Sequence, residues 1–362
     1  MMLGLLCSSC IWLRMFYFNT PSLNAPAYFD SRAVHASTMP KPLNRSAVEA
    51  KPSLSESERA KYDTFDALLE GNDTRAFLAI RDDAVVYERY FGGVTATTPL
   101  PSFSISKTFA ALLVGSALRE GLVSSLDASV VDYIPELSKK RRYEEVTLEE
   151  MLRMTSGIDF DEESPSSAKL FYCTNLRDRI YQYPVRWTPG EHYLYGSVSI
   201  QLLWDVLHRQ LGGATVSQYF EERVWAPLGA EQPAAWALDS DKSGIEKLFG
   251  GFSATARDHA RLGLLYLHGG TLEGRTIVTQ EWVDDSLALD PVAGIVHTHD
   301  GDVRRGKYQW FLTLDRRAYF AKGYHGQYVF VVPEKHMVFV RFGEGYGDVD
   351  WPALFLRIAD TS

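Results

Sequence analysis

Cysteine is scarce in this sequence, with three in 362 residues. Cys7 and Cys10 lie close together in the first apolar stretch and Cys173 stands alone, which excludes a disulfide framework and the usual zinc patterns. We interpret Cys173 as an ordinary buried thiol. The histidines of the stretch 297–300 have no further clustered ligand, so we expect no metal site.

An excess of positive charge is also lacking, because the formal net charge is −9. Phosphate binding needs a clustered basic surface, so we expect no nucleic-acid partner. The basic run at 139–142 is short and has acidic neighbours, which is typical of a solvated turn. No period of 20–50 residues recurs, which argues against a solenoid. The hydrophobic share of 46% is that of a globular protein with a substantial core.

A long hydrophobic run is missing too. Residues 1–18 are apolar apart from Arg14 and two serines, but they are shorter than a comfortable membrane span. They have the length of an export-signal core, and Ala25–Ala27 resembles a cleavage site. We therefore expect a leader or membrane anchor and a bacterial periplasmic location. Because no positive charge precedes the run, a wrongly chosen start, a packed segment and a cytoplasmic location stay as alternatives.

The rest of the chain divides by pattern. Residues 19–58 are rich in Pro, Ser, Ala and Asn and predict an extended arm or linker. Within the domain at 59–362, alternating apolar residues predict strands around Asp82–Asp83 and again from Tyr308, whereas the lobe at about 124–289 is mostly helical. Strands from both chain ends can pair. We therefore predict an α/β (α+β) fold, in which an antiparallel sheet flanked by helices carries an inserted helical lobe beside a cleft.

One stretch combines a nucleophile with an amine. In Phe103–Lys107 a run of small polar residues turns at once into an apolar helix, and Ser104 and Lys107 lie on the same helix face. The helix N-terminus favours an oxyanion near Ser104. The same field and the apolar neighbours disfavour a charged amine, and a neutral lysine can accept the serine proton. Alternatively, Ser104 only caps the helix and Lys107 is solvated.

Two other patterns imitate parts of such a site. Ser166 and Lys169 repeat the spacing, but they lie in an acidic stretch, interrupted by proline, that we predict to be a loop. The triplet at 242–244 reads Lys-Ser-Gly, but it lies in a polar loop and not on a late strand. We assign chemistry to neither.

Two further stretches carry polar groups. Tyr195 and Ser197 begin a helical pattern after a Pro-Gly turn. At the start of a late strand, Gly323 and Gly326 flank a Tyr-His pair. Glycine there permits a close approach of the backbone to a ligand.

With these motifs, the sequence resembles the serine β-lactamase and penicillin-binding superfamily, and within it the class C-like esterases and 6-aminohexanoate-oligomer hydrolases. The resemblance spans roughly residues 60–360. It rests on FSISKTF, TLEEMLRMTSGI, the WTPG and YLYGS pieces, GGFSATARDHARLGLLYLHGG and GYHGQYVFVVPE. These motifs occur in the order of the family, and their joint occurrence is specific.

The resemblance implies roles for individual residues. Ser104 would be the nucleophile, Lys107 its activating amine and Tyr195 the second proton-transfer residue. The tyrosine hydroxyl needs a nearby positive charge to act as a base near neutral pH. The backbone N–H groups of Ser104 and Gln327 would form the oxyanion hole. Such a serine hydrolase needs no cofactor.

The substrate-binding positions depart from the lactamase pattern. Ser197 stands where many members have Asn, and His325 and Gly326 fall where lactamases carry Lys-Thr-Gly. Lactamase-type sites meet the antibiotic carboxylate with that lysine, so we expect a small ester or linear amide as the partner of the site. The alternatives are a β-lactamase or DD-peptidase, and a catalytically inactive relative that binds peptides.

Overall fold

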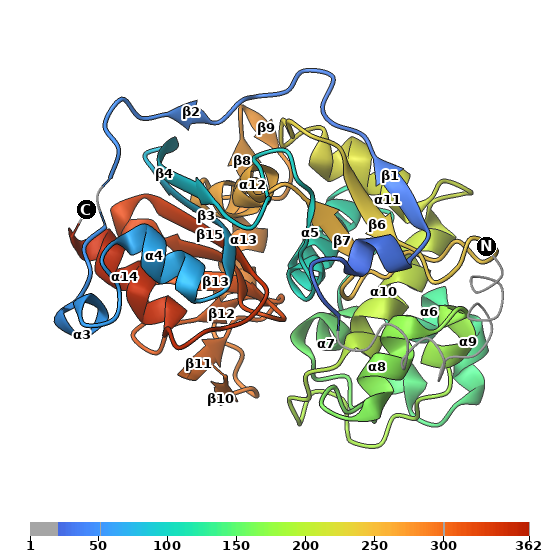
Figure 1. Cartoon of the computed structure of the whole chain (residues 1–362). Coiled ribbons are helices and arrows are strands. Elements are labelled where there is room, and N and C mark those ends of the chain that lie inside the picture. Colours follow the sequence, from blue (N-terminus) through green and yellow to red (C-terminus); the bar gives the residue numbers. More distant parts are fainter. Residues whose placement is uncertain (1–20, 51, 300, 362) are drawn as a thin grey trace, which may run out of the picture.

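The protein is described here by a computed structural model that covers residues 21–50, 52–299 and 301–361. Its main element is a nine-stranded sheet in the order β10-β11-β12-β13-β14-β15-β3-β4-β2 (Figure 1). The strands are β2 (Asn44–Arg45), β3 (Thr74–Arg81), β4 (Ala84–Tyr90), β10 (Ile295–Thr298), β11 (Gly301–Arg305), β12 (Phe311–Leu312), β13 (Tyr319–Gly323), β14 (Gln327–Val332) and β15 (Met337–Gly343).

Strands from the two ends of the chain meet inside this sheet. β15 pairs antiparallel with β3, so that Val340 lies opposite Leu78. β3 and β4 form the predicted hairpin, and Asp82 and Asp83 both adopt the left-handed conformation that a two-residue turn requires. β2 adds a short parallel edge to β4. The predicted α/β fold, with one sheet built from both chain ends, is confirmed.

Helices cover both faces of the sheet. α4 (Phe65–Gly71) and α14 (Trp351–Thr361) pack on one face, and α5 (Ile105–Arg119) and α12 (Ala256–Leu267) pack on the other. Successive side chains of a strand point to opposite faces, so Phe339 belongs to the core under α14, whereas Val338 and Val340 belong to the core under α5 and α12. The middle of the molecule therefore has two cores, separated by the sheet.

The helical lobe lies beside the sheet, at the lower right of Figure 1. Its helices there are α6 (Val130–Tyr133), α7 (Leu148–Arg153), α8 (Pro165–Tyr172), α9 (Leu176–Ile180) and α10 (Ser197–Gln210), and the following α11 (Val216–Phe220) lies at the upper right. The smaller elements are α3 (Glu56–Arg59), β8 (Thr271–Leu272), β9 (Arg275–Thr276), α13 (Gln280–Leu287), the 3₁₀ turns at Ala25–Tyr28, Pro135–Lys139, Tyr143–Glu145 and Pro333–Lys335, and a π-helical turn at Glu221–Trp225.

The region from 124 to 289 also contains strands that the sequence did not indicate. β6 (Ala234–Ala237) and β7 (Phe252–Ala254) join β1 (Ser31–Val34) and β5 (Leu100–Pro101) in a four-stranded sheet of order β1-β6-β7-β5. These strands are three or four residues long at most, which is too short for their period to stand out in the sequence.

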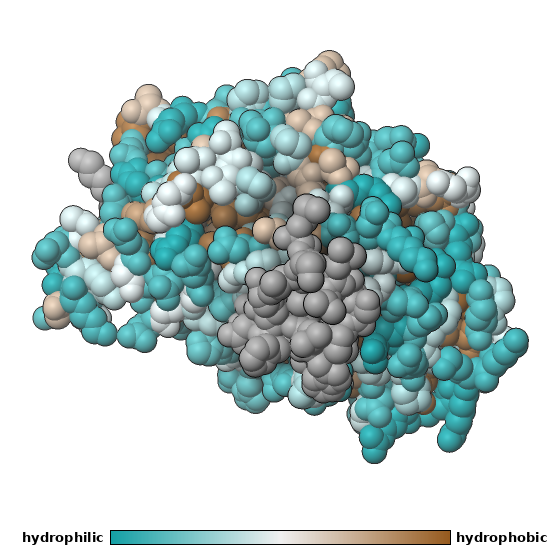
Figure 2. All heavy atoms as spheres, turned by 45° about the vertical axis from the view of Figure 1, so that its right-hand side comes forward, coloured by the Kyte–Doolittle hydropathy of each residue, from teal (hydrophilic) through white to brown (hydrophobic). Residues whose placement is uncertain are grey.

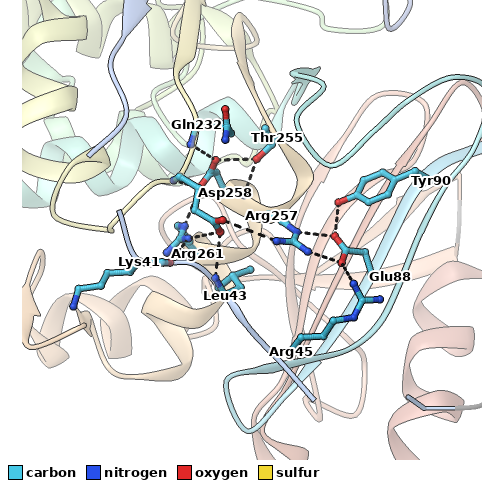
Figure 3. Close-up of polar contacts among 11 residues, drawn as sticks. Lys41, Leu43, Arg45, Glu88, Tyr90, Gln232, Thr255, Arg257, Asp258 and Arg261 are labelled. Atoms are coloured by element: carbon cyan, nitrogen blue, oxygen red, sulfur yellow. Dashed lines mark hydrogen bonds and ion pairs between the residues drawn. The ribbon is translucent and has the colours of Figure 1, made fainter. Parts of the chain in front are cut away.

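The stretch predicted as an arm runs across the top of the molecule in Figure 1 and contributes β1 and β2. Its middle part is held by charged groups (Figure 3). Arg261 donates to the carbonyl of Lys41 at 2.6 Å, and the N–H of Leu43 donates to Glu231 at 3.2 Å. Arg45 reaches Glu88 of β4 at 3.3 Å. The arm is therefore fastened to α12 and to the sheet by polar contacts.

The visible coloured surface in Figure 2 is mostly hydrophilic, with apolar side chains in scattered groups. Within the ranges that the structure describes, no helix is long and apolar enough to cross a bilayer. The predicted leader or anchor at residues 1–18 lies outside the described residues, and its role stays a prediction.

Candidate active site

A tight segment before α5 presents Ser104. Ser102 donates its hydroxyl to the carbonyl of Phe252 at 2.9 Å, and the N–H of Phe252 donates to the hydroxyl of Ser106 at 3.0 Å, which fastens the segment to β7. Between them, Phe103 is held at a φ of 45°, a left-handed conformation that side chains rarely adopt. Such strain is characteristic of functional sites because only a rigid surrounding maintains it.

Lys107 lies directly behind Ser104. Its Nζ donates to Ser104 Oγ at 2.9 Å and to the carbonyl oxygen of Phe249 at 2.9 Å, and the residue is 2% exposed. The Ser104 hydroxyl caps no α5 amide. The interpretation of Ser104 as a mere helix cap, with a solvated lysine, is therefore wrong. Among the described residues, Lys107 pairs with no carboxylate, so its amine is aimed at the serine oxygen within the range for proton transfer.

Tyr195 completes the predicted group. The N–H of Leu194 donates to the carbonyl of Met154 at 2.8 Å, which holds the segment before α10 against the end of α7. Lys107 Nζ lies 5.0 Å from the centroid of the Tyr195 ring. The structure thus brings Ser104, Lys107 and Tyr195, which are up to 91 positions apart in the sequence, to one place.

These three residues line one cavity of about 760 Å³. Its walls come from the start of α5, from the helical lobe and from the edge of the large sheet. Asp161, Glu162 and Glu163 lie on the lobe side, whereas His297 and Lys322 lie on the sheet side. Other lining residues are Phe103, Ser164, Ser167, Phe171, Tyr193, Phe249, Val296, Thr298, His299, Phe311, Gly323, Tyr324 and Tyr346. The cavity has the size of a small-molecule site and carries opposite charges on facing walls.

Ser197 does not line this cavity. It is the first residue of α10 and is 1% exposed, with its N–H 2.8 Å and its hydroxyl 2.7 Å from the carboxylate oxygens of Glu162. A helix N-terminus stabilises a carboxylate, so Ser197 and the α10 amides position Glu162. Any contribution of Ser197 to substrate binding therefore passes through Glu162.

Three predicted residues form a turn behind the cavity wall, in and just after the stretch that corresponds to the lactamase Lys-Thr-Gly, here called the third motif. His325 and Gly326 both have left-handed backbones, and His325 Nε2 lies 2.7 Å from the carbonyl of Pro21. A Cβ on Gly326 would stand 2.5 Å from a guanidinium nitrogen of Arg341, so glycine is required there. The side chain of Gln327 donates to the carbonyl of Tyr324 at 2.9 Å. None of His325, Gly326 and Gln327 lines the cavity.

The end of β13 approaches the nucleophile instead. A Cβ on Gly323 would stand 2.3 Å from the carbonyl oxygen of Ser102, so only glycine permits this contact. Tyr324, next in sequence, lines the cavity, and its ring packs edge-on against Phe103. The predicted close approach of backbone at Gly323 is therefore directed at the strained segment before Ser104.

Sequence reasoning missed several residues of the site. Arg341 on β15 is fully buried and donates to the carbonyls of His325 and Gly326, which fixes the turn. Lys322 lies on the cavity wall, although the sequence analysis considered a cation for the substrate only at Tyr324 and His325. Glu162 and Arg305 were also missed. A charged residue in an otherwise apolar strand was the available signal for Arg341, whereas the polar strand of Arg305 offered none.

The two patterns that imitate parts of the site, the pair of Ser166 and Lys169 and the triplet at 242–244, do not line the cavity. The stretch around Ser166 is not the predicted loop, because Pro165 starts α8 and the Ser164 hydroxyl accepts from the N–H of Ser166. Neither Ser166 nor Lys169 lines the cavity. Cys173 is buried, as predicted, and burial raises the pKa of its thiol.

The Lys-Ser-Gly triplet at 242–244 lies in a turn between β6 and β7. His297 Nδ1 lies 2.6 Å from Asp302 across the β10–β11 hairpin. In the described part of the chain, no three His, Cys, Asp or Glu side chains gather as metal ligands.

Comparison with known proteins adds a family context. The profile of the Beta-lactamase family matches residues 63–361. The 6-aminohexanoate-dimer hydrolase of Paenarthrobacter ureafaciens is 28% identical over 307 residues, which are 78% of this chain and 74% of that protein.

Two solved structures share the fold. A Bacillus anthracis protein described as a candidate 6-aminohexanoate-dimer hydrolase superposes with a TM-score of 0.79 at 23% identity, over 97% of this chain and 93% of that chain. A family VIII carboxylesterase gives a TM-score of 0.64 at 18% identity, over 82% of this chain and 94% of that chain. At these identities the likeness concerns the fold alone.

Proposed function

Because the chain belongs to the beta-lactamase family, as its motifs predict, we propose that it is a serine hydrolase that works through an acyl-enzyme on ester or linear amide substrates. The observation that carries this proposal is the 2.9 Å hydrogen bond from Lys107 Nζ to Ser104 Oγ at the wall of a cavity of about 760 Å³. A nucleophile within hydrogen-bond reach of a base is the signature of covalent catalysis.

The proposed reaction has two halves. Ser104 Oγ attacks the carbonyl carbon of the substrate, and its proton passes through Lys107 and Tyr195 to the departing alcohol or amine. The acyl group then remains on Ser104 as an ester. Water attacks that ester, gives one proton back to the serine oxygen through the same groups, and releases the acid.

The oxyanion needs two donors near Ser104 Oγ. The N–H of Ser104, at the N-terminus of α5, is the first. For the second we favour the N–H of Tyr324 over that of Gln327, because Tyr324 lines the cavity with Ser104 whereas Gln327 is buried on β14. Gly323 supports this choice, since it brings the end of β13 against Ser102.

The charges of the cavity favour a linear amide with charged ends. The relative from Paenarthrobacter is named for the dimer of 6-aminohexanoate, which carries an ammonium at one end and a carboxylate at the other. Asp161, Glu162 and Glu163 offer carboxylates to the ammonium, and Lys322 offers a cation to the carboxylate. The scissile amide then lies between them, toward Ser104.

Lys322 also supports a second candidate, a β-lactamase or DD-peptidase. The expectation of an ester or linear amide substrate rested on the absence of the lactamase lysine, in whose place this chain has Tyr324 and His325. The cavity nevertheless has a lysine on its sheet side, whose Nζ lies 3.4 Å from the hydroxyl of Thr298. A cation at that place can attract the carboxylate of a β-lactam.

One pure sample, tested on three substrates, separates these functions. We expect kcat/KM for a short-chain aryl ester or for the 6-aminohexanoate dimer to exceed that for a chromogenic cephalosporin. A serine-directed phosphonate should leave its covalent adduct on Ser104 in the mass spectrum, and Ser104→Ala should carry none. A cephalosporin preference would establish the second candidate. Absence of both adduct and turnover would identify a binding protein instead.

Export or membrane anchoring through residues 1–18 stays part of the proposal. Fractionation of cells that express the full chain tests it, with a variant lacking residues 1–18 as the control. Recovery of both forms in the cytoplasm would contradict export.

A further inference from the structure

A buried guanidinium lies next to the proposed site without a polar partner. Arg305, at the end of β11, is 1% exposed. Within the described residues, none of its three guanidinium nitrogens has a hydrogen-bond partner. An unpaired charge in the interior is costly, so a surrounding that maintains one calls for an explanation from function.

Aromatic rings surround this guanidinium. Its central carbon lies 4.2 Å from the ring centroid of Phe311, 5.6 Å from that of Tyr193 and 6.0 Å from that of Tyr195. Ring faces attract a cation but do not neutralise it. The positive charge of Arg305 therefore remains uncompensated, and its field reaches the two tyrosines that line the cavity.

The nearby anions are already engaged. The N–H of Asp290 donates to the backbone carbonyl of Arg305, but the carboxylate of Asp290 pairs with Arg153 through two contacts of 2.7 and 3.3 Å. On the lobe side, Glu162 is held by the N–H and the hydroxyl of Ser197. Lys107 from α5 and Arg305 from β11 thus lie near the ring of Tyr195, while Tyr193 and the engaged Glu162 line the same cavity.

The effect of the Arg305 charge on a tyrosine can be seen at Tyr193. Burial raises the pKa of Tyr193 to about 12, and the charge of Arg305 is the largest influence that lowers it. The Tyr193 hydroxyl has no hydrogen-bond partner in the described structure. Both tyrosine residues are partly buried, but the Tyr193 hydroxyl itself is buried, and this burial keeps Tyr193 neutral.

We propose that Arg305 is a positioning residue that stabilises the phenolate of Tyr195, so that Tyr195 can take and return the serine proton near neutral pH. This inference rests on the proposed function. The sequence required a positive charge near Tyr195 without locating it, and the structure offers one from β11, 6.0 Å from the centroid of the ring. Direct binding of a substrate carboxylate is a poorer account, because the guanidinium does not line the cavity.

The test is the pH profile of kcat/KM for an activated aryl ester, measured on the full chain. Arg305→Met should shift the ascending limb to higher pH by about one unit, because an opposite charge at this distance favours the ionised form. Near pH 7 the loss should be about tenfold, with recovery toward alkaline pH. Arg305→Lys should keep the wild-type limb. Arg304→Met on the same strand is the matched control and should also keep it.

A double-mutant cycle shows whether the effect passes through Tyr195. In a Tyr195→Phe background, measured on its residual activity, Arg305→Met should cause no further shift of the limb. If Arg305→Met does not fold, Arg305→Gln carries the same test. An unshifted limb in the charge-removing variant, or a full shift in the Tyr195→Phe background, would overturn the inference while the Ser104 adduct still supports the function.

Discussion

Two regions of this molecule surround their basic side chains in opposite ways. In the network around α12 (Figure 3), each guanidinium meets carboxylates. Arg257 binds both oxygens of Glu88 at 2.7 Å, and Arg261 lies 2.9 Å from both Asp258 and Glu231. In the candidate site, Lys107 meets only the oxygens of Ser104 and Phe249. Arg305 has no polar partner within the described residues.

The difference indicates what each charge is for. In the network, opposite charges neutralise each other over short distances, and these ion pairs and hydrogen bonds hold the arm, α12 and β4 together. In the site, the Lys107 amine is aimed at the serine oxygen, and the charge of Arg305 keeps a field that acts on the tyrosines. α12 joins the two regions, since Asp258 and Arg261 belong to the network while His259 packs on Phe109 of α5. Substitutions can separate the two roles, because those in the site should change turnover and those in the network should change stability.

Loss of the nucleophile should have the largest effect and should leave the network intact. Ser104→Ala should lower turnover of an aryl ester on the order of a thousandfold or more, with an unchanged free energy of unfolding. Ser166→Ala is the matched control, because Ser166 repeats the Ser-x-x-Lys spacing outside the cavity. Equal losses in the two variants would refute the assignment of Ser104.

Replacement of the site amine comes next. Lys107→Arg should lower turnover about a hundredfold or more, nearly as much as Lys107→Ala, because a guanidinium stays charged and cannot take the serine proton. Steady-state kinetics with the aryl ester would measure this. An active arginine variant would show that Lys107 supplies only charge, as the arginines of the network do.

Removing a charge from the network should lower the stability of the protein rather than its turnover. Arg261→Met removes the partner of two carboxylates and should lower the free energy of unfolding by about 3–5 kcal/mol. Arg305→Met leaves no carboxylate unpaired and should cost clearly less. Denaturant titration of both variants gives the comparison. A larger loss for Arg305→Met would mean that Arg305 is a structural cation with partners of its own.

The smallest expected effect concerns a buried group that stays neutral. Burial lowers the pKa of His259 to about 4, against about 6.5 in the unfolded chain. Below pH 6.5 His259 binds a proton in the unfolded chain but stays neutral in the folded protein until the pH approaches 4. The free energy of unfolding should therefore fall from pH 6.5 to pH 4. The contribution of His259 is roughly 3 kcal/mol.

His259→Leu isolates this contribution from that of the carboxylates. The difference in the free energy of unfolding between this variant and the wild type should change in favour of the variant as the pH falls from 6.5 to 4. Urea titrations at pH 7, 5.5 and 4.5 measure it. A difference that does not change with pH would mean that the folded protein binds this proton as readily as the unfolded chain.

Local patterns in the sequence were sufficient for much of the fold. The hairpin at Asp82–Asp83 needs two left-handed residues, and Thr147 and Glu150 form a complete capping box at the start of α7. In both cases neighbours in sequence are neighbours in space, so the pattern contains the interaction. The sequence analysis did not predict β6 and β7, because they are short and because β1 and β5, with which they pair, lie far away in the chain.

The sequence by itself determined the family, the α/β fold with its sheet from both chain ends, and the Ser104–Lys107 pair, because three residues on one helix turn fix a distance. Only the tertiary structure decided which distant groups surround that pair. It placed Ser197 against Glu162, brought Tyr324 and not Gln327 to the cavity, and left Arg305 unpaired behind Tyr195. Such contacts join residues that are far apart in the sequence, and their geometry depends on the packing of whole elements, which no local pattern encodes.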